Sequence, residues 1–482
     1  MNKIWDKETT QLYLLLVICF ISVYYLPAVV TRVVFAVFIL YVFRTKKDYF
    51  WLVFFFILND APGRLFAAGG RDQIMRLPIY SFGIGFSFGF QELFTIAYLL
   101  KVIFLKRRLD FVFIKEFKWF YLLALAAVLY SFMLGMDFKL SLITFRVLLP
   151  WSWVVIFPFF IRDKNTMIKA SRLLFPIVIL ALGSQIYTYF SGTYLDSSYT
   201  KDMVLTEDVA EEGTAVRSGS AGFILFFCIF QSMFYLLSNN TSFKKSYLII
   251  LIFIGSLSTL LSSTRGWIIA LGFFYLGIIL FIPNKLFSRM TIQIAVISFI
   301  LLMALQFVFP VISTQIDNSL ARLSTMEDLA KGDMTAGGTL SRITERGPAV
   351  MNEFSKSPVF GWGFTANFFL NTDGHVGNQS ILLNVGIVGF VILILVYFSI
   401  FFKIWRWSTY PSVVAHYGTS LKVFAISMLC IFMIHSSSTQ FWGYNMEISQ
   451  EAKTIFYAIL FTSVNVLIIG SRSRIKSEKQ TW

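Results

Sequence analysis

Residues 381–402 read ILLNVGIVGFVILILVYFSIFF, a run of 22 residues without a charged side chain. A helix needs about 20 consecutive apolar residues to cross the hydrocarbon core of a bilayer. Backbone polar groups find no water there, so a spanning segment is either a helix or a strand of a closed barrel. Barrel strands alternate apolar and polar residues, whereas this run shows no such alternation. The stretch therefore predicts a transmembrane α-helix.

Similar apolar runs recur along the whole chain, which has 482 residues, 57% of them hydrophobic and 14% charged. Soluble domains carry about 25% charged residues, so most of this protein is expected to contact lipid. Hydropathy predicts spans centred near Val17, Val37, Phe55, Ala97, Ala124, Val154, Ile177, Phe226, Ile254, Phe274, Phe299, Ile392, Met428 and Leu460. We therefore predict an all-α polytopic membrane protein with about 12–14 transmembrane helices.

The formal charge of +15 comes from basic residues that gather in short clusters between the apolar runs. This distribution is typical of topology signals and argues against a nucleic-acid partner. With this set of spans, both chain termini and all the clusters fall on one side, which the positive-inside rule assigns to the cytoplasm. The clusters are Arg44/Lys46/Lys47, Lys106/Arg107/Arg108 with Lys115 and Lys118, Arg162/Lys164/Lys169, Lys244/Lys245, Lys285/Arg289, Lys403/Arg406 and Arg472/Arg474/Lys476/Lys479.

The residue types that hold metals and cofactors do not occur in recognisable patterns. Cys19, Cys228 and Cys430 lie within apolar runs and have none of the spacings of a metal site or a disulfide framework. The sequence contains no Walker loop and no nucleophile elbow. We therefore predict no metal and no cofactor, and an ATP-driven machine is disfavoured.

Three long connections are predicted on the external side, at residues 60–90, 191–217 and 313–377. Long loops of this kind are usually functional or disordered, and we favour function for the third. It contains two segments with partly helical apolar spacing, residues 320–329 and 342–354, and we expect Gly347-Pro348 to interrupt the second. A small, partly helical external subdomain is the resulting prediction.

Several arginines are predicted on the external side, where a cation near lipid needs an anionic partner. Arg265 lies between two apolar runs with little loop around it, and Arg146 lies within an apolar run with no ion-pair partner nearby in sequence. Each is either an interfacial arginine that reaches toward water or a clamp for phosphate, which the planar guanidinium binds through two hydrogen bonds.

The external connections carry further arginines. Arg342 and Arg346 are four residues apart, so they share one face if that segment is helical. Arg64, Arg71 and Arg76 belong to a glycine-containing basic loop that either contacts an anionic ligand or simply lies at the interface.

His375 is the histidine expected in an external loop beside a span. A single histidine is more often structural than catalytic. One that lies beside arginines at a lipid interface is nevertheless suited to accept a proton from a hydroxyl group.

The order of these residues resembles a known family. Arg265 at a helix start and Arg342 before the turn Pro358-x-x-Gly361-x-Gly363 are followed by His375-Val376, nine residues, and Gly386-Ile387-Val388-Gly389. This pattern looks like the O-antigen ligase and polysaccharide polymerase superfamily of bacterial membrane glycosyltransferases, over roughly residues 245–400. The ligase motif of that superfamily is a histidine, a small polar residue, nine residues, Gly, two residues, then Gly, Thr or Tyr. Val376 stands where Asn, Ser or Gln is usual, which weakens the specific ligase assignment more than the superfamily one.

The resemblance implies an enzyme that transfers a glycan from undecaprenyl diphosphate at the periplasmic face of the inner (cytoplasmic) membrane, without nucleotide or metal. The acceptor is the lipid A core in ligases and a growing polysaccharide chain in polymerases. It further implies that His375 is the base and that Arg265 and Arg342 stabilise the diphosphate. The candidates for binding diphosphate or substrate are Arg146, Arg346, Arg64, Arg71 and Arg76.

The resemblance also divides the chain into N-terminal transmembrane helices (1–244), a ligase-like core (245–402) that includes the loop 313–377, and C-terminal helices with a basic tail (403–482). Two other classes remain open. A lipid-linked oligosaccharide flippase or other transporter would carry charged residues along a path through the bilayer centre, whereas a transferase would gather Arg265, Arg342 and His375 at one face. A structural or signalling membrane protein would have no external pocket lined by those three residues.

Overall fold

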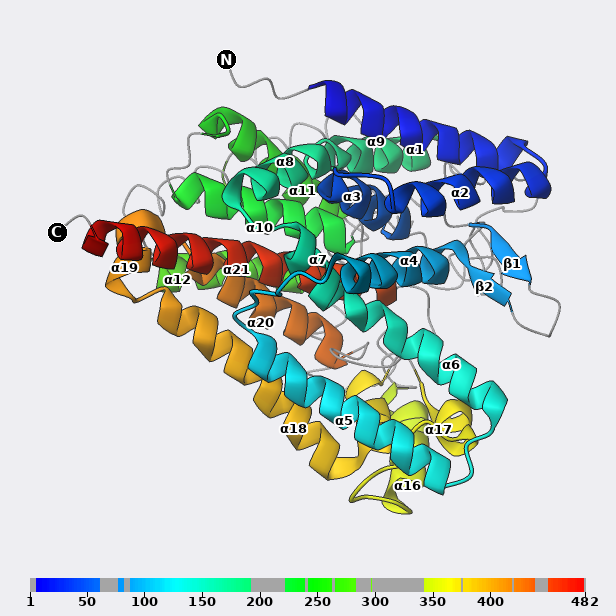
Figure 1. Cartoon of the computed structure of the whole chain (residues 1–482). Helices are drawn as coiled ribbons and strands as arrows, with labels where there is room; N and C mark the ends of the chain where they lie inside the picture. Colours follow the sequence, from blue (N-terminus) through cyan, green and yellow to red (C-terminus); the bar gives the residue numbers. More distant parts are fainter. Residues whose placement is uncertain are drawn as a thin grey trace.

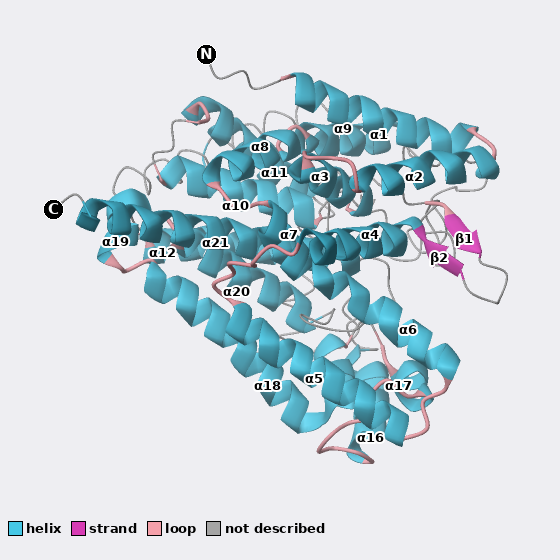
Figure 2. Cartoon of the chain, in the orientation of Figure 1, coloured by secondary structure: helices cyan, strands magenta, loops and turns pink. Residues whose placement is uncertain are grey.

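The computed structural model describes residues 6–60, 77–81, 87–191, 222–238, 242–261, 265–282, 296, 342–373, 376–417, 420–437 and 450–480. Most of these residues are helical (Figure 2). The helices of the first half are α1 (Lys7–Tyr25), α2 (Ala28–Val42), α3 (Asp48–Asn59), α4 (Phe90–Leu105), α5 (Ile114–Met133), α6 (Phe138–Leu148), the 3₁₀ turn η2 (Leu149–Ser152), α7 (Trp153–Phe160), α8 (Lys164–Leu174) and α9 (Ile177–Ser191).

The second half continues in the same way. It contains α10 (Phe223–Leu237), α11 (Lys245–Leu261), α12 (Arg265–Phe281), the π-helix η5 (Arg342–Arg346), α16 (Gly347–Ser355), α17 (Ala366–Asn371), α18 (Gly377–Trp407), α19 (Pro411–Tyr417), α20 (Lys422–Ser437) and α21 (Gln450–Gln480). The predicted interruption at Gly347-Pro348 is the boundary between η5 and α16. Pro348 lies in the first turn of α16, directly after η5, so the change from π-helix to α-helix coincides with it.

The predicted spans are helices in the described part of the chain. Every predicted centre except Phe299, which lies outside the described residues, falls within a helix. Among the described residues, six helices or continuous helical stretches are long and apolar enough to cross a membrane: Lys7–Tyr25, Ile114–Met133, Phe138–Phe160, Lys164–Tyr187, Gly377–Trp407 and Ala452–Ser471. Six shorter apolar helices accompany them in the described ranges. The protein thus has the helices of a multi-pass membrane protein, and the number of crossings stays a prediction.

The outer surface of the bundle is apolar. Leu40, Leu125 and Met133 point outward with exposed fractions of 67%, 54% and 83%. A soluble protein rarely exposes apolar side chains over so much of its surface, because water disfavours them. In lipid, exposing apolar side chains carries no free-energy penalty. The exposed apolar surface therefore agrees with a membrane environment.

One element differs from the all-α prediction. Strands β1 (Ile79–Ser81) and β2 (Ser87–Gly89) form an antiparallel hairpin in which Ile79 lies opposite Gly89. Each strand has only three residues, so neither has enough alternation to be recognised in the sequence. The hairpin precedes α4 and lies within the connection 60–90.

The bundle has two distinct ends. In Figure 1, α19 and the C-terminal end of α21 lie at the left, whereas the hairpin, α16 and α17 lie toward the right. α21 runs through the interior beside α7 and α10. In its apolar part, Ala452–Ser471, 89% of the most apolar 18-residue stretch is buried. Aromatic rings fill the neighbouring core, where Phe55 of α3 stacks on Phe94 of α4 at 4.6 Å. Which end faces the cytoplasm stays a prediction.

A buried ion pair fixes the turn between α2 and α3. The Lys101 ammonium, 8% exposed, donates to the carbonyl oxygens of Val42 and Thr45 at 2.8 Å and to Asp48 Oδ1 at 2.5 Å. Removing one partner of a buried pair leaves an uncompensated charge, which costs about 3–5 kcal/mol.

We expect Lys101→Met to lower the free energy of unfolding by about 3–5 kcal/mol, because the Asp48 carboxylate stays buried without its cation. Thermal unfolding of the purified protein in detergent measures the loss. The double variant Lys101→Met/Asp48→Asn should recover part of it. Equal stability of wild type and Lys101→Met would contradict this role of the pair.

Candidate functional site

α18 is interrupted inside its apolar length, at Gly386. This residue has φ +67° and ψ −174°, so the helical hydrogen bonds stop there and resume with the next residues. In a lipid environment the freed backbone groups need partners within the protein. The segment 358–364 supplies them.

Four backbone hydrogen bonds join this segment to the break. The amides of Ile387 and Val388 donate to the carbonyl oxygens of Pro358 (2.9 Å) and Val359 (3.2 Å). In the other direction, the amides of Trp362 and Gly363 donate to Leu383 O and Asn384 O, both at 2.8 Å. The two glycine-containing pieces of the motif, Pro358-x-x-Gly361-x-Gly363 and Gly386, are therefore in direct backbone contact.

Glycine is required on both sides of this contact. Gly361, Gly363 and Gly386 all have positive φ, a conformation that L side chains rarely adopt. A Cβ on Gly386 would overlap the carbonyl oxygen of Val359, and one on Gly361 would lie 2.5 Å from Asn384 O. The backbones can approach only because neither residue carries a side chain.

Two polar side chains lock the junction to its surroundings. The Asn384 amide Nδ2 donates to Gly363 O at 2.6 Å, and the Phe364 amide donates to the Ser131 hydroxyl of α5 at 2.6 Å. Sequence reasoning missed both residues. Asn384 carries a signal, since it is an amide side chain within the apolar run 381–402, whereas Ser131 carries none.

A polar cluster lies beside the junction, on α16, α17 and the turn between them. Glu353 accepts hydrogen bonds from Asn367 Nδ2 and Lys356 Nζ, both at 2.6 Å, and its backbone carbonyl accepts one from the Trp362 indole at 3.1 Å. The hydrogen bonds from Lys356 and Asn367 hold the pKa of Glu353 below its usual value. These hydrogen bonds tie α16 and α17 to the turn that contains Trp362.

The segment before α18 is anchored to Arg346 and to the first turn of α18. The Asp373 carboxylate lies 3.7 Å from the Arg346 guanidinium, which is 39% exposed. Asp373 O accepts hydrogen bonds from the Ser380 hydroxyl at 2.8 Å and from the Val376 amide at 3.3 Å. Arg346, Asp373 and Val376 are thus brought together at the start of α18. Asp373 and Val376 flank Gly374 and His375 in sequence.

Arg146 lies elsewhere and has an acidic partner that sequence reasoning did not find. Its Nε is 3.3 Å from Glu92 Oε1, and its guanidinium lies over the Phe88 ring at 5.3 Å. Glu92 also accepts a hydrogen bond from the Gly89 amide at the start of α4. No ion-pair partner lies near Arg146 in sequence, and the fold supplies one from a distant segment, because Glu92 is 54 residues away in the chain and near in space.

The other candidates are described only in part. α12 begins at Arg265, as expected for a helix start, and Arg342 begins η5, but the side chains of both lie outside the described residues. His375, Arg64, Arg71 and Arg76 also lie outside the described residues. In the described part of the chain, no group of three His, Cys, Asp or Glu side chains could hold a metal ion.

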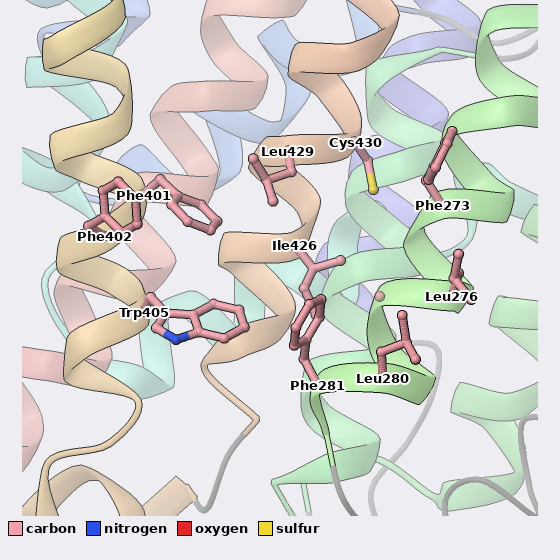
Figure 3. Close-up of a pocket in the computed structure, with 11 residues that line it drawn as sticks. Phe273, Leu276, Leu280, Phe281, Phe401, Phe402, Trp405, Ile426, Leu429 and Cys430 are labelled. Atoms are coloured by element: carbon pink, nitrogen blue, oxygen red, sulfur yellow. The ribbon is translucent and has the colours of Figure 1, made fainter.

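A cavity of about 370 Å³ between α12, α18 and α20 is lined by apolar side chains (Figure 3). Phe273 and Leu280 come from α12, Phe402 and Trp405 from α18, and Ile426 from α20. None of these groups can transfer a proton or stabilise a developing charge. The cavity is suited to hydrocarbon rather than to catalysis.

Asp60, the first residue of the connection 60–90, joins the end of α3 to the start of α10. It follows the last residue of α3, and its carboxylate accepts a hydrogen bond at 2.5 Å from the Ile224 amide at the start of α10. Burial raises the pKa of Asp60 to about 7, although the Ile224 and Phe223 amides oppose the shift. Because the folded pKa lies above the unfolded one, the protonated form contributes stability at low pH, and this contribution is lost as pH rises through about 7.

We expect the wild-type thermal unfolding midpoint to fall between pH 4 and pH 8. The free energy of unfolding should drop by up to about 4 kcal/mol, since the pKa of Asp60 is about 7 in the folded protein and ordinarily 3.8, and one pKa unit corresponds to about 1.4 kcal/mol. Asp60→Asn keeps the acceptor for Ile224 and removes the titration, so its midpoint should change less. Asp110→Asn, at a 73% exposed carboxylate, serves as the control. Identical pH profiles for wild type and Asp60→Asn would refute this prediction.

No protein-family model matches the chain, and no curated protein matches it either. The fold and the apolar surface define a multi-helical protein of the membrane-spanning class. A more specific assignment rests on the site.

Proposed function

We propose that this chain is a bacterial inner-membrane glycosyltransferase of the O-antigen ligase and polysaccharide polymerase superfamily. It transfers a glycan from undecaprenyl diphosphate, at the periplasmic face, to lipid A core or to a growing polysaccharide chain. The observation that carries this proposal is the backbone junction between the Pro358-x-x-Gly361-x-Gly363 turn and Gly386. The motif pieces on either side of His375 in sequence act as one structural unit.

The junction supports the proposal because a transferase site needs rigid supports on either side of its reacting groups. The turn is tied to α18 by four backbone hydrogen bonds and to α5 through Ser131. Asp373, two residues before His375, is tied to Ser380 and paired with Arg346. These contacts fix the sequence neighbours of His375 at the start of a long helix.

The proposed reaction needs neither nucleotide nor metal, since the diphosphate already activates the sugar. The acceptor hydroxyl oxygen forms a bond to the anomeric carbon, and the bond from that carbon to the diphosphate oxygen breaks. The electron pair leaves with undecaprenyl diphosphate, whose charge Arg265 and Arg342 stabilise. His375 accepts the proton of the hydroxyl group.

The remaining arginines have different surroundings. Arg346 is half-exposed beside Asp373 and remains a candidate for binding the donor. Arg146 is paired with Glu92, so its charge is already compensated and it would bind an anion more weakly. In this proposal Arg64, Arg71 and Arg76 contact the donor from the 60–90 connection.

The proposal is tested with the purified protein in liposomes, supplied with the lipid-linked repeat of its host, with and without lipid A core. Glycan attached to core, resolved by gel, identifies a ligase, and a ladder of lipid-linked repeats without core identifies a polymerase. If protein that is folded and correctly inserted forms neither product, the transferase proposal is refuted.

The broken helix α18 favours one alternative, a lipid-linked oligosaccharide flippase or another transporter, because discontinuous helices form the binding sites of many transporters. In those proteins the freed helix ends contact substrate. Here the amides of Ile387 and Val388 already bind Pro358 and Val359. We therefore prefer the transferase, and movement of labelled donor across the liposome membrane without any product would favour the transporter.

A further inference from the structure

A second cavity, of about 650 Å³, lies between α1, α2, the turn that joins α2 to α3, and the start of α3. Its lining combines two kinds of side chain. Phe38, Tyr41 and Trp51 form an apolar and aromatic part, and Arg44, Lys46 and Lys47 form a basic part. This is the composition of a site for an amphipathic anion.

The basic part carries uncompensated charge. Arg44 and Lys46 are exposed and form no ion pair with any residue that the structure describes. Lys47 differs, because its ammonium lies 2.6 Å from the Glu8 carboxylate, which also accepts a hydrogen bond from Tyr49 at 2.6 Å. The cavity therefore retains the charge of two cations.

Hydrogen bonds from Lys101 and within the turn fix the backbone that carries these cations. Val42 O and Thr45 O, which lie on either side of Arg44 in sequence, accept hydrogen bonds from the buried Lys101 ammonium. The Lys47 amide donates to the Thr45 hydroxyl at 3.1 Å. A ligand that binds here does not have to order the turn first.

An apolar stripe leads away from the cavity along α2. Tyr41, Val37, Val33 and Val30 follow a spacing of three to four residues, so they share one face of the helix. All four are exposed, by 49%, 53%, 58% and 42%. From Val30 to Tyr41 the helix rises by about 16 Å, which is close to the length of an acyl chain.

We infer that this cavity binds a phospholipid with an anionic headgroup. The phosphate contacts Arg44 and Lys46, and an acyl chain lies along the Val30–Tyr41 stripe. Basic pockets at the ends of transmembrane helices bind anionic headgroups in this way, and Trp51 and Tyr41 are the aromatic residues typical of the membrane interface. A free phosphate would leave the stripe uncovered, and a zwitterionic lipid would leave the charge uncompensated. The inference does not depend on glycan transfer.

Native mass spectrometry of the full-length protein in detergent tests it. Phosphatidylglycerol and phosphatidylcholine with identical acyl chains are titrated separately, with glycerol 3-phosphate as a soluble competitor. We expect tighter binding of phosphatidylglycerol. Arg44→Gln/Lys46→Gln should weaken it about 30-fold, at about fivefold for each cation near an anionic lipid.

Two further variants separate the site from general charge. Arg108→Gln/Lys118→Gln removes two exposed cations that line neither cavity and should leave the affinity unchanged. Arg44→Lys/Lys46→Arg keeps the charge and should retain binding. Equal affinity for the two lipids, an equal loss in the control variant, or displacement by glycerol 3-phosphate would overturn the inference.

Discussion

Replacing His375, Arg265 or Arg342 with alanine is expected to reduce glycan transfer by at least about 100-fold in each case. Removal of a general base costs about 10²–10⁴ in rate, and removal of a group that stabilises developing charge costs about 10²–10³. The amount of protein in the membrane should not change, since each substitution shortens one side chain and removes no helix. Transfer is measured in liposomes with the lipid-linked donor of the host.

Arg406→Ala is the matched control for these variants. Arg406 is also an arginine of the second half of the chain, but it lies in the last turn of α18, over Tyr410 and far along the helix from Gly377. Its substitution should leave transfer at the wild-type rate. Wild-type transfer by all three site variants would refute the proposed mechanism.

The second large effect is expected for Gly386→Ala, which should lower the free energy of unfolding by about 3 kcal/mol or more. A non-glycine residue in the left-handed region costs about 1–2 kcal/mol, and overpacking adds about 1–3 kcal/mol. The new Cβ would overlap Val359 O, so the 358–364 segment would have to move away from α18. The loss is measured as the fraction of folded monomer after heating in detergent.

Gly272→Ala provides a control with the opposite sign. Gly272 lies inside α12, has nothing within 4 Å of an added Cβ, and has an ordinary helical backbone. Alanine is favoured over glycine in a helix by about 1 kcal/mol, so this variant should be as stable as wild type or more stable. If Gly386→Ala behaved in the same way, the described junction would be wrong.

The helices could be predicted from the sequence because each is signalled by a local property. The apolar run around Ile392 is visible in consecutive residues, and so are those around Val17 and Leu460. A local signal, the Gly347-Pro348 pair, also marked the position at which η5 gives way to α16. Local signals do not report the three-residue strands β1 and β2, which are too short to have a pattern.

Contacts between distant segments could not be predicted in this way. The Arg146 partner, Glu92, and the Lys101 partner, Asp48, are 54 and 53 residues away, and nothing in the sequence indicates either pairing. The glycines of the junction were noticed only through resemblance to a family. Their physical reason, a close approach of two backbones at a break in a helix, becomes visible only in three dimensions.

The most direct test of the central claim is whether the purified protein releases undecaprenyl diphosphate as it transfers glycan. Donor with a labelled lipid is incubated with protein and acceptor in liposomes, and the free lipid diphosphate is quantified beside the glycan product. A glycosyltransferase releases one undecaprenyl diphosphate for each glycan transferred, and the His375→Ala protein should release almost none. Donor that is recovered intact, even after it has crossed the membrane, would contradict the proposed activity.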